Sequence, residues 1–542
     1  MKRHGINWRF FAFHNNENYY SYDCITNKIY KIEHLLYQAI NDANISLIKQ
    51  KNKNFYENVI KKRNISKKQE LKNNKISIDN SKCCVTLDFS NTCNLDCKYC
   101  YRKKSEVSKL SKDELEKIVK YIKTDYFPSA KDYSFSLGYT SESSLDLDYL
   151  IFFDTLIAKY EGYLFNETDF SISEFIEIYS FLPEEIKKKY FLHNTNDVKT
   201  ATSVLNDILM NEKLWNSSKF KQNNYIQNIL DFTNNPSLSK TVIINRQLIN
   251  DNFSKFVVKK DIAYMSMSFM TNGTNITNKY IEFIKSIYMT EIWVSLDGPQ
   301  SIHDKVRIQK NKKGSFEKTI KGIHLLQQNG IFVNCSSVIT PDSLDLLKTT
   351  QFLLSENIKT IAITLPRGKY LEENFNKEMI DTLLESINSI YKQIHSELLR
   401  NEYITFTALK SNIFLYKIKD IVNNKYVSSR CYWGKEVFID SKGDWYHCNS
   451  TIGNPKDNCG SISKKLDYSK IKRQKTLKDY KQCKYCSMKY LCGGLCHADE
   501  MNNYKVSQKL ECYYRKNMFM NLIKFITELK DENFLSKIIQ HL

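Results

Sequence analysis

Short segments with strand character alternate with helical segments between residues 83 and 366. Six apolar runs in this stretch predict strands: CCVTLDF, YSFSLGY, YMSMSFM, EIWVSLD, IFVNCSSVI and KTIAITL. Helical stretches follow most of these runs, for example DELEKIVKYIKTDYF and SFEKTIKGIHLLQQNG. Such alternation is typical of parallel strands, because a parallel connection needs a long crossover that is usually a helix. The pattern therefore predicts an α/β fold for this part of the chain.

The predicted α/β unit covers residues 83–400 and carries an insertion. The gap between its second and third strands is too long for one crossover, so we expect a mostly helical insertion over about 163–258. Before this unit, WRFFAF, YYSYDC and KIYKI predict three short strands, and HLLYQAINDANISLI predicts an amphipathic helix. These elements and a stretch rich in Lys and Asn, expected to be a linker or an exposed helix, form a unit at 1–75.

The chain changes character after residue 425. EVFID-SKGD-WYHC predicts a β-hairpin with Gly443 in its turn, and cysteine-rich loops follow it as far as residue 515. The amphipathic segment MFMNLIKFITELKDENFLSKIIQHL predicts a final helix, within 516–542, that packs on the core.

Composition and charge narrow the functional classes. Hydrophobic residues make up 42% of 542, which suffices for a large core. We expect no membrane span, because no run of about 18 apolar residues occurs. The first residues lack the features of a signal peptide, so we expect a soluble cytoplasmic protein. The net charge of +20 suits nucleic acid, anionic lipid, an acidic peptide or plain solvated surface. Because the lysines are spread out, no nucleic-acid partner is expected.

Eleven of the 15 cysteines fall in two groups, at 93–100 and at 431–512. In a cytoplasmic chain, grouped cysteines indicate metal binding or catalysis rather than disulfides. The other four have no metal-ligand spacing, and we expect them to be small buried hydrophobic residues. They are Cys24, Cys83, Cys84 and Cys335.

The first group, Cys93-x3-Cys97-x2-Cys100, offers three thiolates on one polar loop. Thiolates favour zinc or iron–sulfur clusters, and structural zinc takes four ligands. A four-iron cluster held by three cysteines leaves one iron open to another ligand. The loop follows a predicted strand, at the end of a βα unit where α/β barrels place active sites. Zinc remains an alternative.

The motif Cys93-x3-Cys97-x-Tyr99-Cys100 resembles the signature of the radical S-adenosylmethionine (SAM) enzymes. The resemblance implies a partial (β/α)6 TIM-like barrel and a [4Fe-4S] cluster on the three catalytic cysteines, which binds S-adenosylmethionine (AdoMet) and cleaves it reductively to a 5′-deoxyadenosyl radical. A reducing partner such as flavodoxin or ferredoxin is then expected.

The same resemblance implies AdoMet contacts at the ends of the predicted strands. The second strand ends in GYTSES, where the family has a Gly-Gly-Glu-Pro turn, so Glu is kept while both glycines and the proline are replaced. For Ser295 and Asp297 alone, strand-end capping is the alternative. The implied AdoMet-binding residues are Tyr99, Ser141, Glu142, Asn272, Ser295, Asp297 and Arg307.

The second group of cysteines resembles the SPASM extension of radical SAM enzymes. The resemblance implies two auxiliary [4Fe-4S] clusters, with a zinc ribbon as the alternative. Its near set has three cysteines, and either Cys459 provides the fourth ligand or an iron stays open to a substrate thiolate. The near set is Cys431, Cys448 and Cys496; the far set is Cys483, Cys486, Cys492 and Cys512.

SPASM proteins mostly act on peptides or proteins, and many mature ribosomally made peptides (RiPPs). The first unit resembles the small winged-helix-like α+β domain in which such maturases bind the leader of a precursor peptide as an added strand, with a plain cap on the barrel as the alternative. We therefore expect an oxidoreductase that abstracts hydrogen from a precursor peptide, leading first of all to a thioether from Cys, as in sactipeptides. Alternatives are C–C crosslinking or another peptide oxidation, sulfatase-type formylglycine formation, and a zinc protein that binds peptide or nucleic acid.

Overall fold

The computed structural model describes eight stretches of the chain: 9–57, 82–100, 107–171, 242–247, 253–259, 264–400, 405–431 and 436–541. Short gaps fall at 16, 131, 161–162, 288, 428, 464–465, 468–469 and 471–475. For the strands at 163–171, 242–247 and 253–259, the backbone alone is described.

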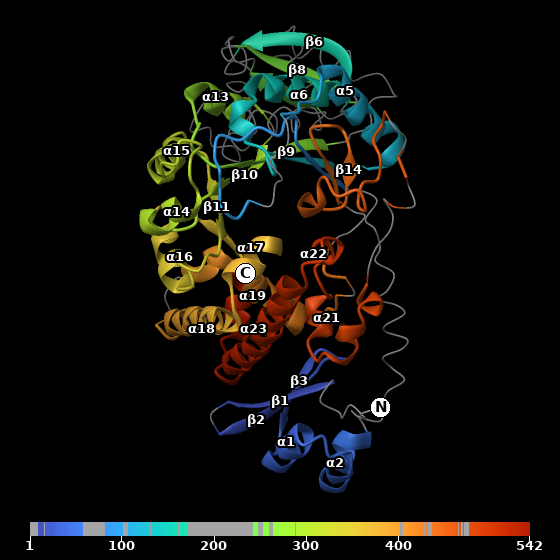
Figure 1. Cartoon of the computed structure of the whole chain (residues 1–542), viewed down its shortest axis with the longest axis vertical. Helices are drawn as coiled ribbons and strands as arrows, with labels where there is room; N and C mark the ends of the chain where they lie inside the picture. The colour runs from blue at the N-terminus through green and yellow to red at the C-terminus, as the bar shows by residue number, and fades with distance from the viewer. Residues whose placement is uncertain are drawn as a thin grey trace, which may run out of the picture.

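An eight-stranded sheet forms the centre of the larger part of the molecule (Figure 1). Six of its strands are parallel and lie in chain order, each paired with the next. Their carboxyl ends therefore meet at one edge, here called the carboxyl edge. All six strands were predicted from the sequence. They are β4 (Lys82–Leu87), β5 (Asp132–Leu137), β9 (Tyr264–Thr271), β10 (Met289–Ser295), β11 (Val333–Val338) and β12 (Thr360–Thr364).

Helices connect these strands, and their first turns carry the expected capping residues. In α5, Ser111 and Glu114 form a reciprocal capping box that satisfies two free backbone N–H groups. The side chains of Thr277 and Asp345 cap the N-terminal ends of α13 and α16, where each accepts a hydrogen bond from a backbone amide of the first turn. The connecting helices are α5 (Lys112–Tyr121), α6 (Leu147–Tyr160), α13 (Asn278–Ser286), α14 (Gln300–Val306), α15 (Phe316–Gln328) and α16 (Leu346–Ser355).

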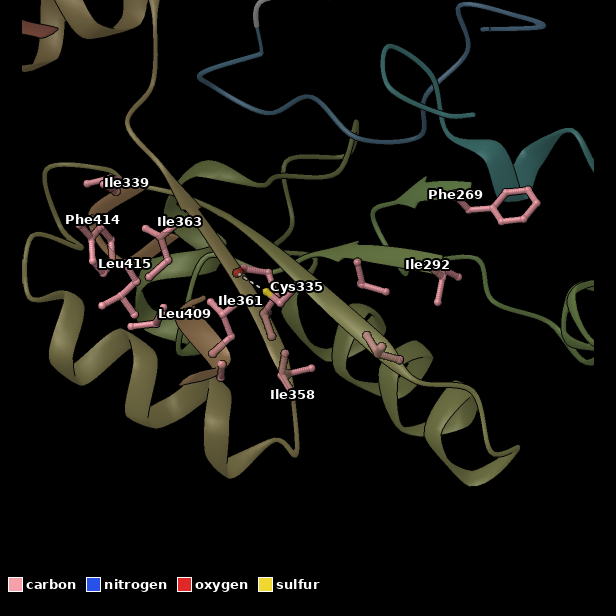
Figure 2. Close-up of a cluster of buried hydrophobic side chains, with 14 of the residues drawn as sticks. Phe269, Ile292, Cys335, Ile339, Ile358, Ile361, Ile363, Leu409, Phe414 and Leu415 are labelled. Carbon is pink, nitrogen blue, oxygen red and sulfur yellow. Dashed lines mark hydrogen bonds between the residues drawn. The ribbon is translucent and has the colours of Figure 1, made fainter. Parts of the chain in front are cut away.

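Alternate residues of the parallel strands point into the core. In β11, buried and half-buried residues alternate, and the neighbouring strands contribute Ile292 and Ile361 to the same cluster (Figure 2). Burying a side chain of this size contributes about 1.5–3 kcal/mol. Cys335 lies in this cluster, where its thiol donates to the carbonyl of Leu296 at 3.3 Å.

The prediction for the four cysteines outside the two groups holds for three of them. Cys24, Cys83 and Cys335 are buried, whereas Cys84 is exposed. The prediction is wrong for Cys84 because successive residues of a strand face opposite sides of the sheet, and Cys83 occupies the inward position on β4.

The predicted hairpin is present as β13 (Glu436–Ile439) and β14 (Trp445–Tyr446). Gly443 has a φ of 74°, and the Asp440 carboxylate accepts from the amides of Lys442 at 2.9 Å and Asp444 at 3.0 Å. β13 also pairs in parallel with β4, with Ile439 opposite Leu87. The sequence did not predict this pairing, which places Asp440 at the carboxyl edge.

The N-terminal unit is an antiparallel sheet with helices on one side. Its strands are those predicted, but the single predicted helix is two helices, because Ala43 takes a φ of 54° and Asn44 then caps the second. The unit has a small core of its own that includes Phe10 and Ile40. Its elements are β1 (Phe10–Asn15), β2 (Asn18–Asp23), β3 (Lys28–Ile32), α1 (His34–Asn41) and α2 (Ile45–Lys51).

The N-terminal unit packs against the C-terminal helices rather than against the large sheet (Figure 1). The hydroxyl of Tyr20 donates to Asp531, and Asn27 Nδ2 donates to the carbonyl of Lys425 at 2.8 Å. The expected linker falls largely on residues 58–81, which lie outside the described residues.

The predicted insertion shows strands at both of its ends. β6 (Tyr163–Ser171), β7 (Val242–Gln247) and β8 (Phe253–Lys259) form an antiparallel sheet in the order β6-β8-β7. The helices expected in this insertion would fall on 172–241, which lie outside the described residues.

The last part of the chain is helical and packs on the core, as predicted. α23 (Lys505–Asp531) begins earlier than predicted and carries Cys512, and Asn533, with a φ of 62°, separates it from α24 (Leu535–His541). α23 lies against α18 (Lys377–Leu399), where the rings of Tyr391 and Phe525 stack at 4.4 Å. Among the described helices, none combines the length and apolar character that crossing a membrane requires.

Candidate active site

The loop with Cys93, Cys97 and Cys100 follows β4 at the carboxyl edge. Its backbone is held by the segment after α14: the amide of Asp96 donates to the carbonyl of Ile308 at 2.7 Å, and that of Lys98 to the carbonyl of Val306 at 2.9 Å. Burial raises the pKa of the Cys97 thiol to about 12. The charge of Arg307 opposes this rise, and the neighbouring thiols of Cys100 and Cys93 add to it. The three cysteines thus lie together on one anchored loop.

Tyr99, Asp297 and Arg307, predicted separately as AdoMet contacts, bind one another. Asp297 accepts from the Tyr99 hydroxyl at 2.5 Å and from two guanidinium nitrogens of Arg307 at 2.9 and 3.3 Å. Asp297 also accepts from the amide of Val338 at 2.9 Å. Burial raises the pKa of Tyr99 well above its ordinary value. This buried group fastens the cysteine loop to the ends of β10 and β11.

Glu142 and Ser141 are also bound within the protein. The fully buried Glu142 accepts from the Thr271 hydroxyl at 2.5 Å, the Asn272 amide at 2.6 Å and the Ser144 hydroxyl at 2.7 Å. Burial raises the pKa of this carboxyl, and the hydrogen bonds oppose the rise. The Ser141 hydroxyl donates to Asp88 at 3.1 Å. Glu142 therefore joins the ends of β5 and β9.

Asn272 connects the end of β9 to the cysteine loop. Its Nδ2 donates to Asn94 Oδ1 at 2.8 Å and lies 3.9 Å from Cys93 Sγ, while its Oδ1 accepts from the Thr274 amide at 2.9 Å. Ser295 lies apart from these bonds, with its hydroxyl 3.9 Å from Met270 Sδ. An Asn amide next to Cys93 is suited to hold an anionic sulfur in place.

The structure brings the near set together. Burial raises the pKa of the Cys448 thiol to about 12, Arg367 opposes this rise, and the thiols of Cys496 and Cys431 add to it. Arg367 Nη1 lies 3.8 Å from Cys496 Sγ. In the described part of the chain, the thiol of Cys496 also lies within 4.8 Å of carboxylate oxygens of Asp499 and Glu511.

These two carboxylates already have strong partners. Glu511 forms a buried bidentate ion pair with Arg430, and Asp499 accepts from the Ser507 hydroxyl at 2.6 Å. Burial opposes ionisation of Glu511, but Arg430 outweighs it and lowers the pKa of the carboxyl to about 2. The cysteines are therefore the donors that remain for iron.

The far set is also brought together. Burial is the main cause that raises the pKa of the Cys483 thiol to about 12. The neighbouring thiols of Cys492, Cys486 and Cys512 raise it further. Cys492 differs from these, because Arg515 Nε donates to its Sγ at 3.2 Å. Burial opposes ionisation of Cys492, but Arg515 and Arg430 outweigh it and lower the pKa of its thiol.

The neighbours of Cys459 are His447 and Asp457 rather than the cysteines of the near set. Its buried Sγ lies 3.7 Å from His447 Nδ1 and 3.4 Å from the carbonyl of Asp457. His447 in turn pairs with the Asp457 carboxylate at 2.8 Å and bonds to the carbonyl of Lys470 at 2.7 Å. The structure therefore associates Cys459 with a buried His–Asp pair.

A polar cavity of about 760 Å³ lies where the hairpin meets the carboxyl edge. Thr140 and Asn91 line it from the end of β5 and from the cysteine loop, and Asn449, which follows Cys448, lines it from the other side. Burial raises the pKa of Asp440, another lining residue, to about 6. The cavity therefore lies beside the start of the first cysteine loop and beside Cys459, which also lines it.

The fold occurs in known enzymes. A solved structure of anSMEcpe with bound AdoMet superposes with a TM-score of 0.53 at 15% identity, over 84% of this chain and 99% of that one. A second structure, of anSMEcpe with bound AdoMet and Cp18Cys peptide, gives 0.52 at 16% identity, over 84% and 99%. At such identity these likenesses show the fold alone. No family model matches the chain.

Sequence relatives extend this likeness. The chain is 24% identical over 298 residues to the cysteine-type anaerobic sulfatase-maturating enzyme of Clostridium novyi (strain NT), covering 51% of this chain and 76% of that enzyme. It is 25% identical over 329 residues to the radical SAM cyclopropyl synthase TigE of Paramaledivibacter caminithermalis, covering 59% of this chain and 63% of TigE.

The sequence relatives and the fold are those of radical SAM enzymes of the SPASM type. Sequence reasoning missed several residues that surround the predicted ligands of this chain. Asp88 and Asn94 stand at a strand end and between two cysteines, which was a usable signal. Arg367 had none, because it reaches Cys496 from a distant element, whereas Arg515 stands three residues after the predicted ligand Cys512 and was overlooked.

Proposed function

We propose that Cys93, Cys97 and Cys100 hold a [4Fe-4S] cluster whose fourth iron binds AdoMet. The observation that carries this proposal is an anchored loop with three thiols at the carboxyl edge of a parallel sheet. When bound and reduced, such a cluster supplies a 5′-deoxyadenosyl radical from AdoMet. The chain's own part is to fix the loop through Asp297 and Arg307 and to hold Cys93 beside Asn272.

We assign the two other sets to auxiliary [4Fe-4S] clusters. The far set has four cysteines, which fits a cluster held fully by protein. The near set has three, and we propose that its fourth position takes a cysteine thiolate of the substrate rather than Cys459. The observation behind this is that Cys459 lies against His447 and Asp457. Arg367, beside Cys496, offers a positive charge to such an anion.

The finer features of the fold belong to the same proposal. Six parallel strands in chain order fit a partial (β/α)6 barrel. The N-terminal unit fits a winged-helix-like peptide-recognition domain, because β1 and β3 each pair with β2 and lie at the edges of their sheet. An extended leader peptide would add to such an edge through backbone hydrogen bonds.

The proposed substrate is a ribosomally made precursor peptide, and the proposed product is a thioether. The relatives support a peptide or protein substrate, because sulfatase-maturating enzymes match the sequence and one such enzyme, anSMEcpe, is known with a bound peptide. The net charge of +20 suits an acidic leader. A flavodoxin or ferredoxin is the proposed electron donor.

The test is an anaerobic reaction of the reconstituted enzyme with AdoMet, a reductant and cysteine-containing peptides encoded beside its gene. We expect 5′-deoxyadenosine and a peptide that has lost two hydrogen atoms and retains its sulfur. The same peptide with Ala in place of Cys should give 5′-deoxyadenosine without a crosslink. An iron-loaded, reduced enzyme that yields no 5′-deoxyadenosine would refute the proposal.

A second candidate is the oxidation of cysteine to formylglycine. It is favoured by the 24% identity to a cysteine-type sulfatase maturase over 76% of that enzyme. The two products differ in composition, because formylglycine replaces the cysteine sulfur with oxygen whereas a thioether keeps it. High-resolution mass spectrometry of the reacted peptide therefore separates the two functions.

A further inference from the structure

The guanidinium of Arg515 is fixed directly on a sulfur of the far set. Its Nε donates to Cys492 Sγ at 3.2 Å, and its Nη2 donates to the carbonyl of Cys492 at 2.9 Å. Its third contact is the ring of Phe519, whose centroid lies 5.6 Å from the guanidinium carbon. Arg515 and Phe519 are four residues apart on α23, so the helix holds both on one face.

The near set has a different electrostatic surrounding. Arg367 approaches Cys496 Sγ at 3.8 Å, which is longer than the contact of Arg515. Arg430 lies between the two sets, but its charge is bound in the ion pair with Glu511. Cys496 is buried and lies within 4.8 Å of the carboxylates of Glu511 and Asp499. Carboxylates thus lie next to a ligand of the near set, whereas a guanidinium donates directly to a ligand sulfur of the far set.

These surroundings act oppositely on a cluster that gains an electron. Reduction adds one negative charge, which a cation and an N–H donor to sulfur stabilise and which burial and nearby anions destabilise. The arginine charge is permanent in proteins, so the effect does not depend on pH. A donor at 3.2 Å from a ligand sulfur is therefore expected to raise the reduction potential of the far cluster.

We propose that Arg515 is a positioning residue that sets the far cluster, held by Cys483, Cys486, Cys492 and Cys512, at a higher reduction potential than the near cluster. This rests on the cluster assignment under the proposed function. Because its reduction potential is the higher of the two, the far cluster accepts an electron from the near cluster. Its ligand Cys512 is exposed, so an electron on this cluster lies close to the protein surface.

The test is a potentiometric titration of the reconstituted enzyme followed by electron paramagnetic resonance. In Arg515→Gln the planar amide remains but the charge is lost. We expect the equilibrium constant for reducing the far cluster to fall about tenfold, which equals about 59 mV for a one-electron couple. Arg515→Lys, which keeps the charge and loses the fork, should give a smaller shift. The near cluster should keep its midpoint in both variants.

Lys524→Gln is the matched control, because it removes one charge from the exposed side of the same helix. It should leave both midpoints unchanged. An unchanged far midpoint in fully iron-loaded Arg515→Gln would overturn the proposal. If Arg515→Gln loses iron, Phe519→Leu tests the same point, because it removes the ring that holds the guanidinium in place. The midpoint of the far cluster should then shift in the same direction. An unchanged midpoint in Phe519→Leu would overturn the proposal. A wild-type enzyme that binds zinc instead of iron would refute the proposed function as well.

Discussion

The two cysteine groups are built in different ways. The first group lies within one loop after one strand, and its anchors come from the neighbouring strand ends, such as Asp297 after β10. The second group draws on loops, short helices and α23. It is surrounded by arginines from separate elements: Arg367 after β12, Arg430 before Cys431, and Arg515 on α23.

This difference separates local from long-range organisation. The first group depends on the rule that parallel strands gather their loops at one edge, so its position follows once the sheet forms. The second depends on how α23 packs against α17 (Gly368–Asn374), α18 and α21 (Lys489–Cys492). A change in the first group should therefore abolish AdoMet cleavage, whereas a change in the second should alter the content and potential of the auxiliary clusters.

The largest expected effect is that of Cys97→Ala. AdoMet cleavage should fall to background, because the loop would keep two thiolates where three are needed, and iron should fall from about twelve to about eight atoms per chain. The measurements are 5′-deoxyadenosine formation and iron analysis. Cys84→Ala, at an exposed position on β4, is the control and should retain both. Cleavage that survives in Cys97→Ala would refute the assignment of this loop.

The next effect compares Cys496→Ala with Cys459→Ala. Cys496 is a proposed ligand of the near cluster and lies beside Arg367, so Cys496→Ala should lose about four irons. Cys459 lies beside His447 instead, so Cys459→Ala should lose none. Iron content and Mössbauer spectra of the two proteins measure this difference. Loss of the near cluster in Cys459→Ala would make Cys459 its fourth ligand and would contradict an open iron.

The buried ion pair of the first region should dominate its stability. Asp297→Ala leaves Arg307 charged and buried without its partner, at an expected cost of about 3–5 kcal/mol in the free energy of unfolding. Urea denaturation followed by circular dichroism measures it. Lys305→Ala removes an exposed ion pair between Lys305 on α14 and Asp342 after β11 and should cost about 1 kcal/mol or less. Equal costs for both variants would contradict the role of burial.

The sequence predicted elements that rest on short-range signals. All six parallel strands, the hairpin with Gly443 and the three N-terminal strands occur where periodicity and turn residues indicated. It misjudged the helix after β3, because nothing in the pattern marks Ala43 as left-handed. It also missed the pairing of β13 with β4, which joins residues about 350 positions apart and leaves no local trace.

The site was predictable to a similar extent. The family resemblance implied the near and far sets, and the structure brings the thiols of each set close to one another. Spacing could not show that Tyr99, Asp297 and Arg307 bind one another. Nor could it separate Cys459 from the near set, since that depends on the buried position of His447.

Two buried histidines, one in each region, should respond to pH in opposite directions. His303 belongs to the first region: its Nδ1 accepts from the Asp297 amide at 3.4 Å, so its Nε2 carries the proton and donates to Ser315 Oγ at 2.9 Å. Burial lowers the pKa of His303 to about 4. Its neutral form is therefore the one that the fold accommodates.

For His303, stability is present above the unfolded pKa of about 6.5 and is lost as the pH falls toward 4, because the unfolded chain binds the proton first. We expect the urea midpoint of the wild type to fall between pH 6.5 and 5, by an amount equal to about 1–2 kcal/mol. His303→Gln, which has no such titration, should show a shallower fall. Parallel profiles would contradict the lowered pKa of His303 in the folded chain.

His447 in the second region should give the reverse and the smallest effect. Burial opposes its charged form, but the hydrogen bonds and charges of Asp457 and Cys459 together outweigh burial and raise the pKa of His447 to about 10. The unfolded chain loses this proton near pH 6.5. The stabilisation is thus complete below that pH and declines as the pH rises toward 10. Between pH 7 and 8 we expect a loss of about 1 kcal/mol in the wild type and less in His447→Gln, read from urea midpoints. A steeper loss of stability with rising pH in His447→Gln would contradict a stabilising imidazolium–carboxylate pair in this hairpin. The buried histidines of the two regions would then not differ in charge state.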